Sequence, residues 1–269
     1  MIGEDHMKDI PANTVLIIGA SQGLGLQWVK YYKGCNHIVI ATTKNIDAAI
    51  ELKGLLTGSD DKILKLDVTN TDSVISAMNH IQNAPDIIIY NAGVKGYTKC
   101  PDFKATLLNA QLVNNGISSR DEGREVAFQV NAYGFDRVIS VLKDKILMKP
   151  KVAVAYISTG VANISQNISG GYPHYRQSKA AGDAYVRGWD IDLCQETMLD
   201  SRPRIFSIIP GLINTGMGTD IEGAADPIKR VADMAAVIEH VKITGDTHGI
   251  WKYDGTKHVQ YELPVIIRG

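Results

Sequence analysis

Apolar runs and amphipathic stretches alternate along the chain. Runs of mostly apolar, often β-branched residues predict strands at 14–20, 37–42, 62–67, 86–90, 152–158, 204–209 and 250–253. Segments with helical spacing predict intervening helices at 23–33, 47–56 and 72–82. Strands with little alternation are typical of a sheet covered on both faces, and repeated β-α-β order implies parallel strands. The pattern predicts an α/β fold, a Rossmann-type doubly wound parallel sheet of about seven strands with helices on both faces.

Length and composition indicate a single domain over residues 1–269 with an N-terminal tail at 1–12. The formal net charge of −1 gives no basic surplus for a nucleic-acid partner. No apolar run approaches the roughly 20 residues that span a bilayer, and the N-terminus lacks the apolar core of a signal peptide. We expect a cytoplasmic protein that does not enter a membrane. Cys35, Cys100 and Cys194 form no CxxC pair, so we expect reduced thiols and no metal site.

Two segments outside these elements have a predicted place in ligand binding. Residues 94–125 form a long, polar, weakly periodic connection, and a connection of that length is unusual without a function. We expect it to lie above the carboxyl ends of the strands, where ligands bind. Residues 217–225 are glycine-rich and are followed by Pro227, which predicts a mobile substrate lid.

The first predicted strand ends in a glycine-rich turn. Its sequence is Gly19-Ala20-Ser21-Gln22-Gly23-Leu24-Gly25. Glycines let the backbone turn tightly and approach a pyrophosphate, and the following helix offers free N–H groups to that phosphate. No Gly-Lys-Ser/Thr follows, so the turn is not a P-loop. Its position between the first strand and the first helix predicts a dinucleotide site, the alternative being an ordinary turn.

The end of the second predicted strand bears on the choice of dinucleotide. An NAD-specific site usually has an acid there, which grips the ribose 2′-hydroxyl. This chain has Thr43-Lys44 and no acid. Lys44 could meet a 2′-phosphate, which favours NADP(H) over NAD(H), although Lys44 could also be a surface lysine.

Tyr175 and Lys179 open an alanine-rich segment with helical character. Their i, i+4 spacing puts both side chains on one helix face. A free tyrosine titrates near pH ~10, and a nearby ammonium lowers that pKa by favouring the phenolate. The pair could then pass a proton to or from a carbinol oxygen. The spacing alone is common on solvated helix faces, so its meaning depends on the motifs before it.

Taken together, the motifs resemble the short-chain dehydrogenase/reductase family over nearly the whole chain, from Thr14 to about Thr256. The glycine turn matches the family pattern except that Ile18 replaces a threonine. The further matching motifs, in chain order, are Asp67-Val68, Asn91-Ala92-Gly93, Asn131, Tyr175 with Lys179, and Pro210-Gly211 with Thr215. The segments Ser169-Gly170-Gly171, Tyr175–Ala181 and Tyr253-Asp254-Gly255 are similar to the C-factor/sniffer branch of carbonyl reductases.

The resemblance implies hydride transfer between NADP(H) and a small-molecule carbonyl or alcohol. It implies that Tyr175 is the general acid, that Lys179 lowers its pKa and binds the nicotinamide ribose, and that Asn131 holds a water in the proton relay. The predicted cofactor-binding residues are Gly19, Ser21, Gln22, Gly23, Leu24, Gly25, Thr43, Lys44, Asp67, Val68, Asn91, Ala92, Gly93, Tyr175, Lys179, Pro210, Gly211, Ile213 and Thr215.

The hydroxyl that polarises the substrate carbonyl is a departure from the family. Where the family has Ile-Ser-Ser, this chain has Ile157-Ser158-Thr159, so Thr159 takes the position of the catalytic serine. A threonine hydroxyl donates as serine does, although its methyl group restricts χ1. In a regular strand Ser158 points to the opposite face. Thr159 is the favoured donor, and the alternatives are Ser158 or no donor.

Two further expectations concern role and assembly. The changes at Ile18 and Thr159 would permit an NADP-binding sensor with vestigial catalysis, whereas intact Tyr175, Lys179 and Asn131 favour an enzyme. Family members often pair through the helices at 175–197 and 226–244, so we expect a homodimer or homotetramer. On the first of these helices, Asp190 and Asp192 are expected to be solvated or to face a second subunit.

Overall fold

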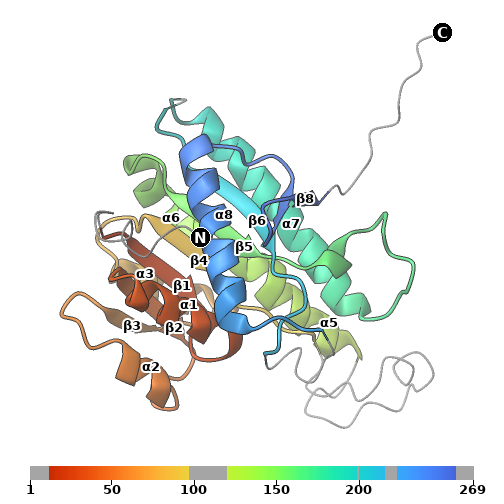
Figure 1. The fold of residues 1–269 in the computed structure, drawn as a ribbon, viewed down its shortest axis with the longest axis horizontal. Helices are drawn as coiled ribbons and strands as arrows, with labels where there is room; N and C mark the ends of the chain where they lie inside the picture. Colours follow the sequence, from red (N-terminus) through yellow and green to blue (C-terminus); the bar gives the residue numbers. More distant parts are fainter. Residues whose placement is uncertain (1–11, 97–119, 199, 216–222, 259–269) are drawn as a thin grey trace.

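A computed structural model describes residues 12–96, 120–198, 200–215 and 223–258. One eight-stranded sheet runs through the molecule in the order β3-β2-β1-β4-β5-β6-β7-β8 (Figure 1). The strands are β1 Thr14–Ile18, β2 Ile38–Thr43, β3 Lys62–Lys65, β4 Ile87–Tyr90, β5 Ala153–Ile157, β6 Arg204–Ile209, β7 Ile250–Lys252 and β8 Lys257–His258. All neighbouring pairs are parallel except β7 with β8. The predicted doubly wound parallel sheet is confirmed, with a short antiparallel strand added at one edge.

The helices are α1 Gly23–Gly34, α2 Ile50–Leu55, α3 Thr71–Asn79, α5 Arg120–Phe128, the π-helix η2 Gln129–Tyr133, α6 Gly134–Met148, the 3₁₀ turn η3 Gly160–Ala162, α7 Pro173–Gln195 and α8 Pro227–Thr244. The end of the predicted connection at 94–125 is helical, because α5 begins at Arg120. Residues 97–119 of that connection lie outside the described residues, as do residues 217–222 of the predicted lid.

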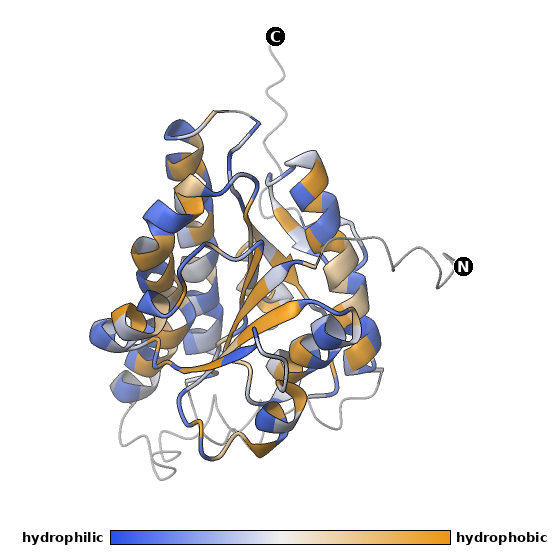
Figure 2. Ribbon diagram, turned by 90° about the vertical axis from the view of Figure 1, so that its left-hand side faces the viewer, coloured by the Kyte–Doolittle hydropathy of each residue, from blue (hydrophilic) through white to orange (hydrophobic). Residues whose placement is uncertain are grey.

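Helices cover both faces of the sheet (Figure 2). On one face, α1, α2 and α8 pack through buried side chains that include Trp28, Leu52 and Met234. On the other, α3, α6 and α7 pack through a second cluster that includes Met78 and Phe135. Alternate strand residues enter the two clusters, which explains why the strands show little polar alternation.

The order of the strands creates a switch point beside β1. The chain moves outward from β1 to β2 and β3, and then crosses to β4 on the other side of β1. Loops that leave β1 and β4 therefore diverge, and in open α/β sheets ligands bind in the crevice between such loops. The glycine turn follows β1, and Asn91-Ala92-Gly93 follows β4, so both motifs lie at this crevice.

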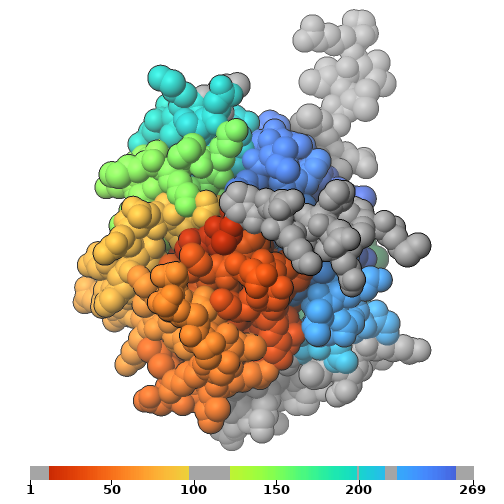
Figure 3. Space-filling view, turned by 60° about the vertical axis from the view of Figure 1, so that its left-hand side comes forward, coloured from red at the N-terminus to blue at the C-terminus, as the bar shows by residue number. Residues whose placement is uncertain are grey.

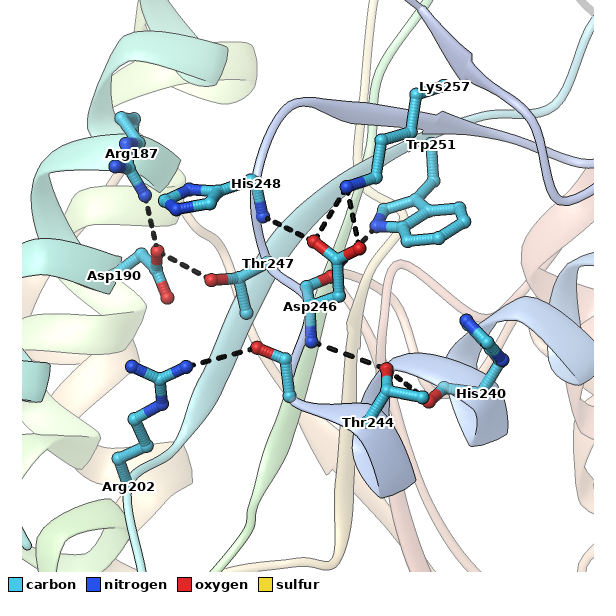
Figure 4. A network of polar contacts seen from close by, with 11 residues as sticks. Arg187, Asp190, Arg202, His240, Thr244, Asp246, Thr247, His248, Trp251 and Lys257 are labelled. Atoms are coloured by element: carbon cyan, nitrogen blue, oxygen red, sulfur yellow. Dashed lines mark hydrogen bonds and ion pairs between the residues drawn. The ribbon is translucent and has the colours of Figure 1, made fainter. Parts of the chain in front are cut away.

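A polar network ties α7 to the segment before β7 (Figure 4). Asp190 accepts hydrogen bonds from Arg187 at 2.7 Å and from the Thr247 hydroxyl at 2.8 Å. Asp190 is only 3% exposed, so the expectation that it is solvated or faces a subunit is wrong. The network lies at the amino ends of β6 and β7, opposite the carboxyl edge of the sheet.

The space-filling view shows how α8 lies against the first elements of the chain (Figure 3). The elements up to α3, coloured red to orange, form one contiguous area, and α8, in blue, lies against it. In the part of the chain that the structure describes, no helix is both long enough and apolar enough to cross a membrane.

Candidate active site

The glycine turn is a cradle with no room for side chains. Gly19 directly follows β1 and has φ of +82°, a backbone conformation that favours glycine. A Cβ on Gly25 would overlap the Gly19 carbonyl oxygen and would lie 2.8 Å from the Asn91 amide nitrogen. That amide donates to the Gly19 carbonyl at 2.9 Å, which joins the loops after β1 and β4.

The start of α1 is suited to an anionic group. Its first turn contains no acidic residue, and the side chain of its N-cap residue, Gln22, makes no capping hydrogen bond. The first N–H groups of a helix have no partner within the helix, and the helix dipole adds a partial positive charge there. These features fit a dinucleotide phosphate over the cradle. Ser21 and Gln22 form the approach to this helix, and Leu24 lies in its first turn.

The Lys44 ammonium lies at the ends of β2 and β3. Lys44 directly follows Thr43, the last residue of β2, and its Nζ is 2.9 Å from the Asp67 carboxylate. The Asp67 carboxylate also accepts from the Thr69 backbone N–H and hydroxyl. Although partial burial opposes ionisation, the hydrogen bonds from Lys44 and Thr69 hold the pKa of Asp67 below its ordinary value. Val68, beside it, is buried.

Tyr175 and Lys179 lie one turn apart near the start of α7, beside the end of β5. Pro173 opens this helix, where its fixed φ suits the first turn. Thr159 lies two residues beyond β5, and its hydroxyl interacts with Tyr175 in the sense that favours the phenolate. The adjacent Ser158 is buried and donates instead to Asp183 at 2.8 Å. The structure therefore brings Thr159, and not Ser158, to the tyrosine.

Burial dominates the electrostatics of this pair. It raises the pKa of Tyr175 above its ordinary value, and the interaction with the Thr159 hydroxyl only partly offsets it. The sequence predicts a lowered pKa, and that prediction is wrong because desolvation disfavours the phenolate. Burial lowers the pKa of Lys179 to about 8, against the opposing charge of Asp183. The ammonium donates to the Ile157 carbonyl at 2.6 Å.

Asn131 is fully buried within the π-helix between α5 and α6. Its side chain accepts from the Val94 N–H and donates to the Val94 carbonyl, each at 2.8 Å, and it also donates to the Ser178 hydroxyl at 2.8 Å. Its backbone carbonyl accepts from the Tyr156 hydroxyl at 2.6 Å. Asn131 thus connects the loop after β4 to α7 and β5. A Cβ on Gly93 would lie 3.3 Å from Lys179 Nζ, so that loop passes close to the ammonium.

The turn after β6 closes the far side of the crevice. Gly211 has φ of +70°, and Ile213, which is buried, pairs with Ala225 in an isolated bridge. The turn reaches the glycine cradle, since a Cβ on Gly23 would lie 4.0 Å from the Thr215 Cβ.

Three residues at this edge were not among the predicted site residues. Arg230 of α8 donates to the Pro210 carbonyl, and its guanidinium lies 3.2 Å from the centroid of the Tyr253 ring. Tyr156 and Asp183 contact Asn131 and Ser158 as described above. Asp183 could have been noticed in the sequence, because it continues the i, i+4 series of Tyr175 and Lys179 on a helix face that must pack. Among the described residues, no three His, Cys, Asp or Glu side chains group as metal ligands.

Comparisons with known proteins identify related sequences. The sequence profile of the short chain dehydrogenase family matches residues 13–225. An uncharacterized oxidoreductase of Schizosaccharomyces pombe is 23% identical over 261 residues, which cover 89% of this chain and 95% of that protein.

Solved structures share the fold. The carbonyl reductase Sniffer of D. melanogaster superposes with a TM-score of 0.77 at 22% identity, covering 91% of this chain and 98% of that one. The NADPH-bound carbonyl reductase from chicken fatty liver gives a TM-score of 0.76 at 18% identity, covering 93% and 100%. The profile match spans well over half of the sequence, with the glycine cradle and the Tyr175–Lys179 helix both inside it, and this chain therefore belongs to the short-chain dehydrogenase family.

Proposed function

We propose that this chain is an NADP(H)-dependent oxidoreductase that interconverts a carbonyl group, in an aldehyde, ketone or quinone, and an alcohol. One observation carries the proposal: Tyr175, which interacts with the Thr159 hydroxyl, lies one helical turn from the buried Lys179, and the loop after β4 passes close to that lysine at Gly93. A hydroxyl donor, a proton donor and a cation are thus gathered at the edge of the sheet where ligands bind.

The cofactor would be held by residues from five loops. The glycine cradle and the start of α1 fit the pyrophosphate, Lys44 fits a 2′-phosphate, and Asp67-Val68 flanks the adenine side. Asn91-Ala92-Gly93 and the Pro210–Thr215 turn border the nicotinamide side, with Lys179 at the ribose. When bound, the nicotinamide supplies or accepts the hydride.

The chain's own groups manage the charge on the substrate oxygen. The Thr159 hydroxyl donates a hydrogen bond to the carbonyl oxygen, which stabilises the negative charge that develops there. Tyr175 then donates its proton to that oxygen as the alcohol forms. The ammonium of Lys179 stabilises the phenolate that remains. In the oxidation direction the same groups act in reverse.

The choice of NADP(H) rests on Lys44 and on the absence of an acid after β2 in the sequence. The NADPH in the chicken fatty liver carbonyl reductase, a protein of the same fold, supports it.

The test is NADPH oxidation against a panel of aldehydes, ketones and quinones. We expect turnover of at least one class by the wild-type chain. Tyr175→Phe keeps the ring but removes the transferable proton, so turnover should fall by about a hundredfold or more while NADPH binding changes little. Lys179→Met should reduce both. Tight NADPH binding with no turnover of any carbonyl would contradict the proposal and would indicate a sensor.

A further inference from the structure

Asp183 is a buried carboxylate directly behind the proposed proton relay. It lies on α7 at i+4 from Lys179 and i+8 from Tyr175, and therefore on the same helix face. Only 7% of the residue is exposed. An acid at such a position is uncommon, because burying a carboxylate without partners is strongly unfavourable.

Two strands supply partners for both oxygens of this carboxylate. The Ser158 hydroxyl donates to one oxygen at 2.8 Å, and the Ser207 hydroxyl of β6 donates to the other at 2.7 Å. A carboxyl group that accepts at both oxygens is satisfied as the anion. The pair of hydrogen bonds also fixes where the charge lies, between the end of β5 and the middle of β6.

The helix approaches the sheet closely at this point. A Cβ on Gly182 would lie 2.8 Å from the Asn131 carbonyl oxygen and would overlap the Tyr156 hydroxyl. Little space remains for solvent between α7 and β5, so charges in this layer are weakly screened.

Among the described residues, few titratable groups interact with Asp183. They are Lys179 and Tyr175 on its own helix and Tyr156 on β5, while β6 contributes the neutral Ser207. Lys179 is the single cation among these three groups, and its other contacts, the Ile157 carbonyl and the face of Tyr156, carry no full charge.

We propose that Asp183 is a positioning residue for the Tyr175–Lys179 pair, a fixed anion that keeps the Lys179 ammonium and the Tyr175 hydroxyl protonated at the pH of carbonyl reduction. The expected effect on the rate of carbonyl reduction rests on the proposed function, whereas the expected effect on the Tyr175 and Lys179 protons does not. The negative charge of Asp183 raises the pKa of both groups. Burial raises the pKa of Asp183 itself to about 6, so the anion is present above that pH.

Asp183→Asn isolates the charge, because asparagine has nearly the same shape and still hydrogen-bonds both serine hydroxyls. The matched control is Asp190→Asn, which removes a second buried carboxylate from the same helix at a site that faces Arg187 and Thr247. Both variants place an amide where a buried carboxylate was, so both can lose stability for that reason. Only Asp183→Asn is expected to change the titration of Tyr175.

The first measurement needs neither cofactor nor turnover. Protein labelled with ¹³C in its tyrosine rings is titrated by NMR, and the Tyr175 signal is identified by its loss in Tyr175→Phe. We expect the Tyr175 midpoint to move to lower pH in Asp183→Asn and to stay unchanged in Asp190→Asn. An unchanged midpoint in Asp183→Asn would overturn the inference.

The second measurement is the pH profile of kcat for NADPH-dependent reduction. The alkaline limb of Asp183→Asn should move to lower pH by a similar amount, and the two profiles should converge below about pH 6, where wild-type Asp183 is protonated. A midpoint that shifts in Asp183→Asn, together with a wild-type chain that reduces no carbonyl, would reject the proposed function and leave this inference standing. If the wild type reduces carbonyls normally, and Asp183→Asn has the same pH profile and the same Tyr175 midpoint as the wild type, the proposed function stands and this inference is rejected.

Ser207→Ala provides a second route if Asp183→Asn does not fold. It removes one hydroxyl donor and so favours the protonated form of Asp183. The ionisation of Asp183 should then occur at a higher pH, so the step that this ionisation produces in the Tyr175 ring signal, near pH 6 in the wild type, should move upward. The alkaline limb should stay in place, because Asp183 is ionised there in both proteins. A Tyr175 signal that shows no step near pH 6 in either protein would overturn the inference.

Discussion

Burial acts in opposite directions on the two titratable groups of the proposed relay. Burial disfavours the charged phenolate of Tyr175, so its pKa lies above the ordinary value. Burial disfavours the charged ammonium of Lys179, so its pKa falls to about 8. Both groups are nevertheless protonated at neutral pH, which is the state that carbonyl reduction requires of a general acid and its supporting cation.

This difference predicts the pH dependence of cofactor affinity. Below about pH 8 Lys179 is an ammonium that can donate to the ribose, and above it the charge is lost. The dissociation constant of NADPH should therefore be flat below that pH and rise above it. Lys179→Met should bind more weakly, with no such rise, in fluorescence titrations over the same range. An equal rise in both proteins would assign the titration to another group.

The hydroxyl beside Tyr175 is testable by three substitutions. Thr159→Ser keeps the donor and should retain turnover, whereas Thr159→Ala should lose most of it, by about a hundredfold. Ser158→Ala removes a donor to Asp183 and should have a smaller effect on kcat. Steady-state rates for the three variants decide the matter. If Thr159→Ala keeps normal turnover and Ser158→Ala is inactive, Ser158 and not Thr159 is the hydroxyl donor to the substrate carbonyl.

Lys44 should decide the preference between cofactors. Its ion pair with Asp67 is largely exposed, and such pairs contribute about 0–1 kcal/mol, so the ammonium can turn toward a phosphate at little cost. Lys44→Ala should weaken NADPH binding about tenfold and leave NADH nearly unchanged. Lys30→Ala, which breaks the surface pair with Glu51, is the matched control and should change neither affinity. Equal losses for NADPH and NADH in Lys44→Ala would exclude a 2′-phosphate role.

At the scale of elements, the site depends on how closely two loops approach at the switch point. The turn after β1 and the loop after β4 are joined by the Asn91 amide, and α1 begins directly over that contact. Neither loop can move outward without breaking this hydrogen bond. The two loops also leave no room for a side chain at Gly25 of α1.

Gly25→Ala should therefore damage both the fold and the cradle. A Cβ there overlaps backbone atoms that cannot rotate away, so we expect a destabilisation of roughly 1–3 kcal/mol and a loss of NADPH binding. Gly34→Ala is the matched control in the same helix, because its Cβ would meet nothing within 4 Å. That variant should be unchanged or more stable by up to about 1 kcal/mol. Denaturant unfolding and NADPH fluorescence measure the two effects, and similar behaviour of both variants would refute the steric argument.

At the scale of the whole molecule, both outer helices of the predicted assembly carry apolar hollows. One, on α7 beside α6, is lined by Asp136, Ala181, Ala184, Tyr185, Gly188, Trp189 and Asp192. The other lies between α8 and β7 and includes Val237, His240 and Trp251. These are the helices that the family resemblance assigns to subunit contacts.

We therefore predict a homodimer or homotetramer. Ala184 is exposed in the hollow on α7, so Ala184→Arg should place an unpaired charge in the contact and reduce the mass of the assembly. Ala48→Arg makes the same change at an exposed position away from both helices and should leave the mass unchanged. Light scattering over a range of protein concentrations measures the mass of the assembly for both variants. A monomer mass for the wild type at every concentration would reject the prediction.

The sequence by itself determined the local features of this protein. Apolar runs placed seven of the eight strands, because burial on both faces of a sheet demands such runs. Glycines at 19, 23 and 25 placed the cradle, and helical spacing put Tyr175 and Lys179 on one face. The strand at Lys257–His258 was missed because two residues carry no pattern, and α6 was missed although its buried positions do recur at helical spacing.

Only the tertiary structure decided what surrounds these features. The contacts of Asp183 with Ser158 and Ser207, and of Arg230 with Pro210 and Tyr253, join segments that are 20 or more residues apart, and no local pattern encodes them. The direction of the Tyr175 pKa depends on how deeply the packed helix buries the ring. Burial is a property of the whole packing and not of the spacing between two residues. Spacing therefore identified the tyrosine and the lysine, while the packing around them determined the directions in which their pKa values shift.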